Sequence, residues 1–275
     1  MTEVEQAPPG VDATTPTPAR LYDYYLGGTN NFAIDREVAE RLRASLPELT
    51  DAAWANRGFH QRAARWMAGQ HGISQFIDLG SGLPTQGNTH EAVTPLAPAA
   101  RVVYVDHDPM VLAHAKALLD STGATAVIQA DLRDPAAVLD HPELRAVLDL
   151  GQPAGLLMTA VLHFVADESD PWGLVARYMR AAAPGSYLAL SHATADRLPP
   201  RAVTAMYATY ENATERIQLR SRAEFERFFD GLELVAPFDG AEPGITFVGK
   251  WGAEDACAAD TDGSRVLYCG VARRP

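Results

Sequence analysis

Phe76-Ile77-Asp78-Leu79-Gly80-Ser81-Gly82 is a short apolar run that passes directly into a glycine turn. Such a run is typical of a buried strand, and glycines let the backbone approach a ligand closely where the strand ends. A second apolar run, Arg101–Asp106, ends in a carboxylate about 24 residues after Gly82. A Rossmann-like site accepts hydrogen bonds from ribose hydroxyls at this position. The two runs therefore predict a binding site for a ribose-containing cofactor.

Short apolar runs continue to alternate with helical stretches, which is the pattern of βαβ units and a parallel sheet. Asp108-Pro109 and Asp170-Pro171 each begin a helix, with Asp as the cap and Pro at the first helical position. Besides the two runs above, strands are expected at residues 124–129, 155–160, 186–192, 232–236 and 265–271. No helix is evident between the last two strands, so we expect an antiparallel, hairpin-like ending.

The chain before the first strand divides into two parts. Residues 1–18 are rich in Pro, Thr, Ala and Gly and predict a flexible tail. Residues 19–72 contain apolar positions at helical spacing, and we expect three helices that form a cap or lid. Residues 73–275 are then the cofactor-binding domain. With 275 residues and 47% hydrophobic content, the chain suits one large α/β domain with such an addition.

Charge and composition exclude several classes of partner. The net charge of −12 disfavours a nucleic-acid partner. No apolar run approaches the roughly 20 residues that span a bilayer, and the start, residues 1–6, is acidic and polar, so we expect a cytoplasmic protein without a membrane partner. Cys257 and Cys269 lack any metal-ligand spacing, and no metal is expected. The sequence gives no indication of the oligomeric state.

The remainder of the glycine turn separates two kinds of cofactor. A dinucleotide fingerprint needs a further glycine three residues after the second one, where the helix N-terminus meets the pyrophosphate. Thr85 occupies that position and follows Pro84, and the turn runs on to Asn88. The turn therefore argues against a pyrophosphate.

These residues also carry a resemblance to a known family. Asp78-Leu79-Gly80-Ser81-Gly82 resembles motif I of class I S-adenosylmethionine-dependent methyltransferases, Val105-Asp106 their acidic motif II, and Ala130-Asp131-Leu132 their adenine-contacting aspartate. More narrowly, the stretch 22–32 (YDYYLGGTNNF), together with residues 80–85 and 103–109, is similar to a bacterial methyltransferase family once catalogued as a domain of unknown function. Pro84 departs from the broad class, in which many members carry a third glycine.

The resemblance implies a Rossmann-like fold with a seven-stranded, mostly parallel sheet whose last strand is antiparallel. It also implies S-adenosylmethionine as the cofactor and S-adenosylhomocysteine as the product. By position, the resemblance places the cofactor against Asp78 and its methionine moiety along Gly80, Ser81 and Gly82. It places Asp106 on the ribose, His107 near the adenine, and Asp131 and Leu132 at the adenine amine. Thr159 and Ala160 would belong to a loop that continues to Phe164 and lines the reactive end.

Other residues are candidates for chemistry or substrate contact. His163 and His192 each lie near the end of an expected strand, where an imidazole could act as a general base or form a hydrogen-bonded wall. Arg57 could pair with the cofactor carboxylate or lie on the surface. The remaining histidines, His60 among them, are assigned to surfaces or helix caps. Lid or substrate contacts are expected from Tyr22, Tyr25, Gly28 and Asn30, and a substrate contact is also expected from His192.

The sequence favours methyl transfer from S-adenosylmethionine to a small-molecule acceptor. A non-catalytic, regulatory S-adenosylmethionine-binding protein is the alternative from another class, because no acceptor-specific motif is present. An NAD-dependent oxidoreductase is the third reading, which the turn at Pro84 and Thr85 disfavours.

Overall fold

A large, mostly parallel sheet forms the centre of the computed structural model, which describes residues 7–8, 10–84, 87–115 and 123–275. The strand order is β3-β2-β1-β4-β5-β8-β6, and β7 pairs with β8. Strands β1 to β5 are parallel, whereas β8 runs antiparallel to β5, β6 and β7. The strands are β1 Gln75–Leu79, β2 Arg101–Asp106, β3 Thr125–Gln129, β4 Gly155–Thr159, β5 Tyr187–Ala193, β6 Glu233–Leu234, β7 Thr246–Phe247 and β8 Leu267–Arg273.

The strand order reverses at β1, and this reversal positions the site. β1 has β2 on one side and β4 on the other, so the connections leave β1 and β4 toward opposite faces of the sheet. In open α/β sheets, ligands bind outside the carboxyl ends of the strands at such a switch point. Leu79 pairs with Val105 in the register of β1 and β2, so the glycine turn and Asp106 leave the sheet side by side.

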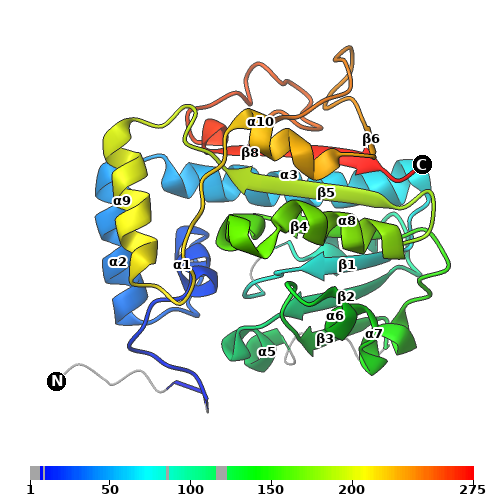
Figure 1. The fold of residues 1–275 in the computed structure, drawn as a ribbon, viewed down its shortest axis with the longest axis horizontal. Coiled ribbons are helices and arrows are strands. Elements are labelled where there is room, and N and C mark those ends of the chain that lie inside the picture. Colours follow the sequence, from blue (N-terminus) through cyan, green and yellow to red (C-terminus); the bar gives the residue numbers. More distant parts are fainter. Residues whose placement is uncertain (1–6, 9, 85–86, 116–122) are drawn as a thin grey trace.

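Helices cover both faces of the sheet (Figure 1). The long α3 lies along one face, α8 and α10 lie on the other, and α1, α2 and α9 stand together beyond the carboxyl ends of the parallel strands (Figure 1). The helices are α1 Pro18–Tyr25, α2 Ala33–Ser45, α3 Leu49–His71, α4 Thr89–Val93, α5 Pro109–Ala115, α6 Pro135–Leu139, α7 Pro142–Val147, α8 Pro171–Ala181, α9 Pro200–Glu211 and α10 Arg222–Glu226.

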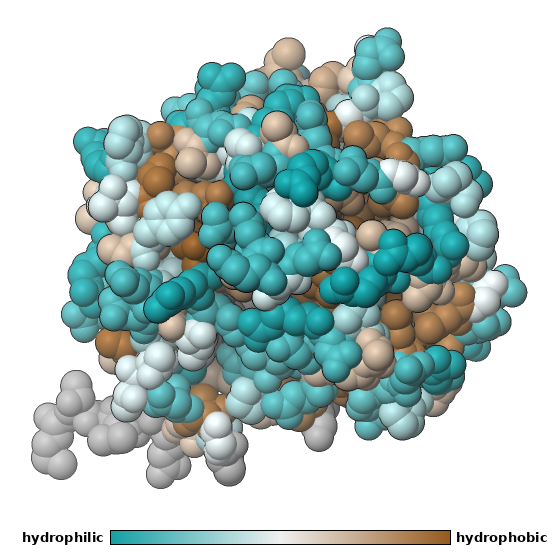
Figure 2. Space-filling model, in the orientation of Figure 1, coloured by the Kyte–Doolittle hydropathy of each residue, from teal (hydrophilic) through white to brown (hydrophobic). Residues whose placement is uncertain are grey.

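The apolar side chains fill two main layers, one on each face of the sheet. Phe59 and Met67 of α3 pack in the layer that contains Phe76 of β1, while Ile77, the next residue of β1, packs in the opposite layer with Tyr178 of α8. This alternation follows from the period of two along a strand. Hydrophilic residues cover most of the face seen in Figure 2, and hydrophobic ones gather there in smaller patches. None of the helices in the described ranges has the length and apolar character needed to cross a membrane.

The predicted fold class and the first five strands are confirmed, with strand ends shifted by no more than about a residue. The described residues form an eight-stranded sheet rather than the expected seven-stranded one, because the short β7 also pairs with β8. The expected antiparallel ending is also confirmed, although residues 232–236 contribute only the two-residue β6. The prediction missed α9, which begins at Pro200 directly after Pro199. Two prolines suggest a loop, yet proline is well suited to the first turn of a helix because its missing N–H has no intrahelical partner there.

Residues 10–17 pack against the body of the protein, which differs from the flexible tail expected to reach residue 18. Arg20 is buried and forms an ion pair with Asp35 at 2.7 Å. The same guanidinium donates to the carbonyl oxygens of Asp12, at 3.0 Å, and Thr15. Thr17 caps α1. The packed region therefore begins near Gly10, while residues 1–6 and 9 lie outside the described ranges.

Candidate functional site

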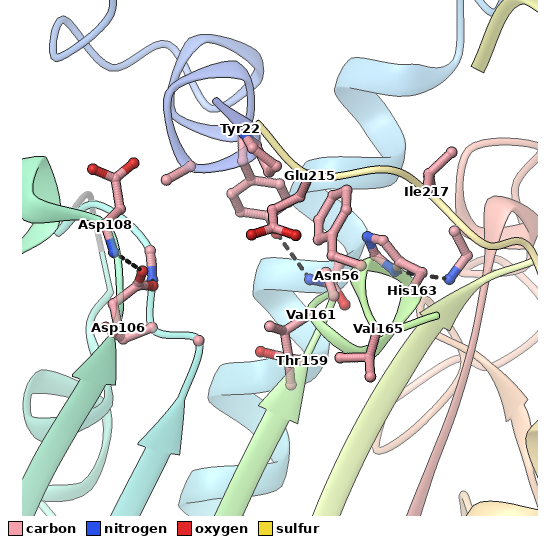
Figure 3. Close-up of a pocket in the computed structure, with 18 of the residues that line it drawn as sticks. Tyr22, Asn56, Asp106, Asp108, Thr159, Val161, His163, Val165, Glu215 and Ile217 are labelled. Atoms are coloured by element: carbon pink, nitrogen blue, oxygen red, sulfur yellow. Dashed lines mark hydrogen bonds between the residues drawn. The ribbon is translucent and has the colours of Figure 1, made fainter. Parts of the chain in front are cut away.

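A large cavity opens at the carboxyl ends of the parallel strands, lined by residues that surround the switch point. It has about 1430 Å³ free of protein atoms, its open mouth included. Figure 3 shows side chains from the ends of β2 and β4, from α1 and α3, and from the segment after α9 converging on it. Segments far apart in the sequence thus form one site.

The glycine turn forms one wall of the cavity. Gly80 and Gly82 have φ of 71° and 65°, values that favour glycine. A Cβ on Gly80 would come within 2.8 Å of the Cβ of Val161, so this position admits no side chain, whereas none of the residues described lies within 4 Å of the Cβ position of Gly82. The N–H groups of Gly80 and Ser81 both donate to Val105 O. The turn is therefore fixed and leaves open space beside Gly82. Thr85 lies outside the described residues.

Asp106 lies at the end of β2 and lines the cavity beside this turn. Its two carboxylate oxygens accept from the backbone N–H of Gly82 at 2.9 Å and of Asp108 at 3.0 Å (Figure 3). Burial raises the pKa of Asp106 above its ordinary value. Asp108 caps α5 by accepting from Met110 N at 2.8 Å, as expected from the Asp-Pro pair. The carboxylate of Asp106 is thus held in place between the turn and the following helix.

Charged side chains from three separate segments meet at the mouth of the cavity. His107 Nε2 lies 3.2 Å from Glu215 Oε1, and Arg133 contacts both Glu215, at 3.3 Å, and Asp131, at 2.8 Å. The hydrogen bond from His107 to Glu215 raises the pKa of that histidine. Leu132 lines the cavity between Asp131 and Arg133. This cluster links the loops after β2 and β3 to the segment after α9.

A buried hydrogen-bonded chain runs beneath the cavity floor and ends at Thr159. The hydroxyl of Thr89 donates its only hydrogen to Asp78 Oδ2 at 2.7 Å. Its oxygen can therefore only accept from His60 Nε2, which lies 2.8 Å away. The other ring nitrogen of His60, Nδ1, then carries a lone pair and accepts from the hydroxyl of Thr159 at 2.9 Å. Burial raises the pKa of Asp78 to about 6 and lowers the pKa of His60 to about 3.

The expected direct contact of Asp78 with the cofactor is thus corrected, because its side chain reaches the site only through this chain. His60, assigned to a surface or cap, is instead buried and lines the cavity.

The loop after β4 forms the far wall. Ala160 has φ of 54°, an uncommon value for a residue other than glycine, and its N–H is held by Ser191. His163 lines the cavity and is buried, and its Nδ1 accepts from Ala193 N at 3.3 Å (Figure 3). Burial lowers the pKa of His163 to about 3. A ring with so low a pKa is a weak base that binds a proton poorly near pH 7, which does not support the predicted general base.

His192 does not line the cavity, so its predicted contact with substrate is corrected. Its Nε2 accepts from buried Arg220 at 2.7 Å, and its Nδ1 then donates to Ala193 O at 2.7 Å. Arg220 also donates to Leu162 O at 2.9 Å and Val165 O at 2.7 Å. His192 and Arg220 together hold the loop that carries His163.

The first helix supplies only part of the predicted lid. Tyr22 and Tyr25 line the cavity, but Gly28 and Asn30 do not. Asn30 donates its backbone N–H to Asp23 at 2.9 Å, and a Cβ on Gly28 would collide with that carboxylate. The predicted substrate contacts of Gly28 and Asn30 are corrected, because the loop closes around a buried aspartate.

Helix α3 contributes two adjacent polar residues, Asn56 and Arg57, to the cavity. Arg57 is buried, and its guanidinium lies over the ring of Tyr22, 5.8 Å from the centroid. Asn56 donates to the hydroxyl of Tyr22 at 2.9 Å (Figure 3) and accepts from Ser191. The surface alternative for Arg57 is therefore wrong.

The sequence-based prediction did not include Asn56 and Glu215 among the site residues. Asn56 lies between Ala52 and Phe59 on the buried stripe of α3, so a polar residue at an apolar position was an available signal. Glu215 lies in an irregular segment after a helix that was itself missed, and no local pattern marks it.

The fold and the cavity define the class of protein. A parallel sheet with a glycine turn after β1, a carboxylate after β2 and an enclosed site at the switch point is a Rossmann-like cofactor-binding enzyme fold. Comparison with known proteins then decides the family. A family model described as S-adenosyl methyltransferase matches residues 4–275. The chain belongs to this family, and it is an S-adenosylmethionine-dependent methyltransferase.

Solved structures agree with this assignment. A DUF574 family protein from Streptomyces avermitilis is 42% identical with a TM-score of 0.88, and the match covers 96% of this chain and 99% of that one. A candidate methyltransferase from Thermobifida fusca is 40% identical with a TM-score of 0.89, covering 98% and 99%. The N-methyltransferase NodS from Bradyrhizobium japonicum, in complex with S-adenosylhomocysteine, shares the fold at 12% identity with a TM-score of 0.50, covering 86% and 98%. The comparison with curated proteins finds no match. The family assignment favours methyl transfer over the regulatory and the NAD-dependent alternatives.

Proposed function

We propose that this methyltransferase transfers the methyl group of S-adenosylmethionine to a small-molecule acceptor in the cytoplasm. The observation that carries the proposal is the cavity itself, which is enclosed by α1, α3, α9 and the loop after β4. An enclosed site of this kind suits a small acceptor better than a nucleic acid, which the net charge of −12 would also repel. The free thiols of Cys257 and Cys269 fit a reducing compartment.

The residues present fit the cofactor. The open space beside Gly82 allows a ligand to lie directly on the backbone, and Gly80 and Ser81 extend that surface. In the proposed arrangement, the methionine moiety lies along this turn, its carboxylate meets Arg57, and Asp106 accepts from the ribose. His107, Asp131 and Leu132 flank the adenine, and Thr159 and Ala160 lie at the reactive end. Support for the carboxylate contact comes from the buried position of Arg57, because guanidinium and carboxylate pair bidentately.

The protein's contribution to the reaction is alignment and exclusion of water. S-adenosylmethionine, when bound, supplies a methyl group already activated on a sulfonium sulfur. Tyr22 and Tyr25 of α1 line the cavity, and we assign the lid to them. The loop that Arg220 holds fixes His163 at the far wall. This wall orients an acceptor, and a proton that an O–H or N–H acceptor loses on methylation passes to solvent rather than to His163.

The experiment is a methyl-transfer screen. The purified protein is incubated with radiolabelled S-adenosylmethionine and a fractionated bacterial extract. We expect label in the low-molecular-weight fraction, and a Gly82→Ala variant, which fills the space for the cofactor, should transfer much less. Transfer only into protein or nucleic acid would contradict the small acceptor. Cofactor binding without any transfer would favour the regulatory alternative.

A further inference from the structure

The end of the cavity beyond Thr159 is built mainly from apolar side chains. Tyr25 of α1, Phe164 of the loop after β4, Met206 and Tyr210 of α9, and Ile217 line this acceptor end. The carboxylates of the site, Asp106, Asp108, Asp131 and Glu215, belong to the turns and loops at the cofactor end. With Arg57 assigned to the cofactor carboxylate, the described side chains of the acceptor end present no charge to a substrate.

The polar groups near the acceptor end are largely satisfied within the protein. The hydroxyl of Tyr22 donates to Ala53 O at 3.0 Å and accepts from Asn56 Nδ2 at 2.9 Å, while Asn56 Oδ1 accepts from Ser191. Thr159 donates to His60. These donors are already engaged, so they do not recognise a substrate without breaking an internal bond.

Two residues of the lining are exceptions. The buried hydroxyl of Tyr25 has no hydrogen-bond partner among the described residues, and the hydrogen bonding of His163 fixes which ring nitrogen carries the proton. A backbone N–H can only donate, so Nδ1, which receives the N–H of Ala193 at 3.3 Å, carries the lone pair. The proton of the neutral ring is therefore on Nε2. Figure 3 shows this second nitrogen turned away from that bond and into the cavity. Among the described residues, no hydrogen bond engages it.

Neighbouring side chains hold the ring in this orientation. Phe164 packs against it with centroids 4.4 Å apart, and His192 meets it edge-on at 5.4 Å. The charged side chain that acts on this ring is Arg220, which is bound to two carbonyl oxygens of the loop and paired with Asp167 at 2.7 Å. Burial in these surroundings keeps the imidazole neutral, with a pKa lowered to about 3.

We propose that the methyl acceptor is an uncharged, mainly apolar molecule with a lone-pair oxygen or nitrogen, and that the Nε2–H of His163 donates a hydrogen bond to that atom. This proposal rests on the proposed function and adds the chemical class of its substrate. A buried donor selects for such a partner, since a ligand that lacks the lone pair leaves the N–H unpaired. His163 is then a specificity-determining residue with a fixed tautomer.

The tautomer is tested first, by nuclear magnetic resonance. In the full chain with S-adenosylhomocysteine bound and histidine labelled with ¹⁵N, long-range proton–nitrogen correlations identify the protonated nitrogen, and His163→Gln assigns the signals. We expect the proton on Nε2 and no titration of this ring between pH 5 and 8. A proton on Nδ1, or a ring that titrates in this range, would overturn the proposal.

Three probes of similar size then test the substrate class on the same complex. Acetophenone has an uncharged lone-pair oxygen, ethylbenzene has none, and benzoate is charged. We expect acetophenone to bind about fivefold more tightly than ethylbenzene and to bind more tightly than benzoate. Binding of acetophenone should also shift the Nε2–H signal of His163. The advantage over ethylbenzene should vanish in His163→Leu and persist in His114→Leu, a control on α5 outside the cavity lining.

Equal affinities of acetophenone and ethylbenzene, preference for benzoate, or no binding of any probe would each refute the proposal. Titration of S-adenosylhomocysteine into the same variants separates the two levels of the account. If S-adenosylhomocysteine binds and the probes are not distinguished, only the substrate class fails. If S-adenosylhomocysteine does not bind to the wild-type protein, the proposed cofactor site itself fails.

Discussion

Replacing Gly80 by alanine should destabilise the fold far more than replacing its neighbour Gly82. Both glycines have positive φ, which costs an alanine about 1–2 kcal/mol. At Gly80 the new methyl group would also come within 2.8 Å of Val161 Cβ, and overpacking of this kind costs about 1–3 kcal/mol. We therefore expect Gly80→Ala to lower the free energy of unfolding by about 2–5 kcal/mol, and Gly82→Ala by about 1–2 kcal/mol.

Cofactor binding should respond differently in the two variants. The methyl group of Gly82→Ala enters the open space where we place the cofactor, so its affinity for S-adenosylhomocysteine should fall although the fold is only mildly affected. Gly72→Ala is the matched control, because Gly72 also has φ of 65° with nothing near its Cβ position but ends α3 away from the cavity. Urea unfolding and calorimetry measure both quantities. The reasoning is refuted if Gly80→Ala is no less stable than Gly72→Ala, or if Gly82→Ala binds as the wild type does.

Three further substitutions test individual contacts. Within the described part of the chain, the buried hydroxyl of Tyr25 has no hydrogen-bond partner, so Tyr25→Phe should raise the free energy of unfolding by about 1 kcal/mol, and a loss of stability would show that the hydroxyl is bonded. Arg220→Met leaves buried carbonyl oxygens of the loop unpaired and should cost about 3 kcal/mol in urea unfolding; a neutral result would contradict its role in holding the loop. The pKa of Asp78 is raised by burial from 3.8 to about 6, so its stabilising effect is complete below the unfolded pKa and is lost as pH rises. Relative to Asp78→Asn, the wild type should lose about 3 kcal/mol of stability between about pH 3 and about pH 7, and parallel pH profiles would contradict the raised pKa.

The sheet could be predicted from the sequence because its signals are local. Apolar runs such as Phe76–Leu79 are buried on both faces and need no knowledge of their neighbours to be recognised as strands. The glycine turn and Asp106 follow from strand ends, which a parallel sheet brings to one edge. Helix α9 was missed because its buried stripe, Ala202, Met206 and Tyr210, is narrow and its start coincides with two prolines.

The site was predictable only in part, since a side chain's direction depends on tertiary contacts. Asp78 carries a carboxylate at the expected position, yet it turns away from the cavity because Thr89 offers it a hydrogen bond. Gly28 and Asn30 look like loop residues available to a substrate, but buried Asp23 organises them. The cluster around Glu215 joins segments that are more than 80 residues apart, as its contact with Arg133 shows, and no spacing rule identifies such a meeting.

Calorimetric titration of S-adenosylhomocysteine into Asp106→Ala measures the ribose contact at this residue, on which the proposed cofactor site depends. Asp134→Ala is the matched control, since Asp134 also caps the start of a helix after a strand, accepting from Ala137 N at 3.1 Å, but does not line the cavity. We predict that Asp106→Ala binds at least about tenfold more weakly than the wild type, while Asp134→Ala binds like it. Equal affinities of Asp106→Ala and the wild type would contradict the account.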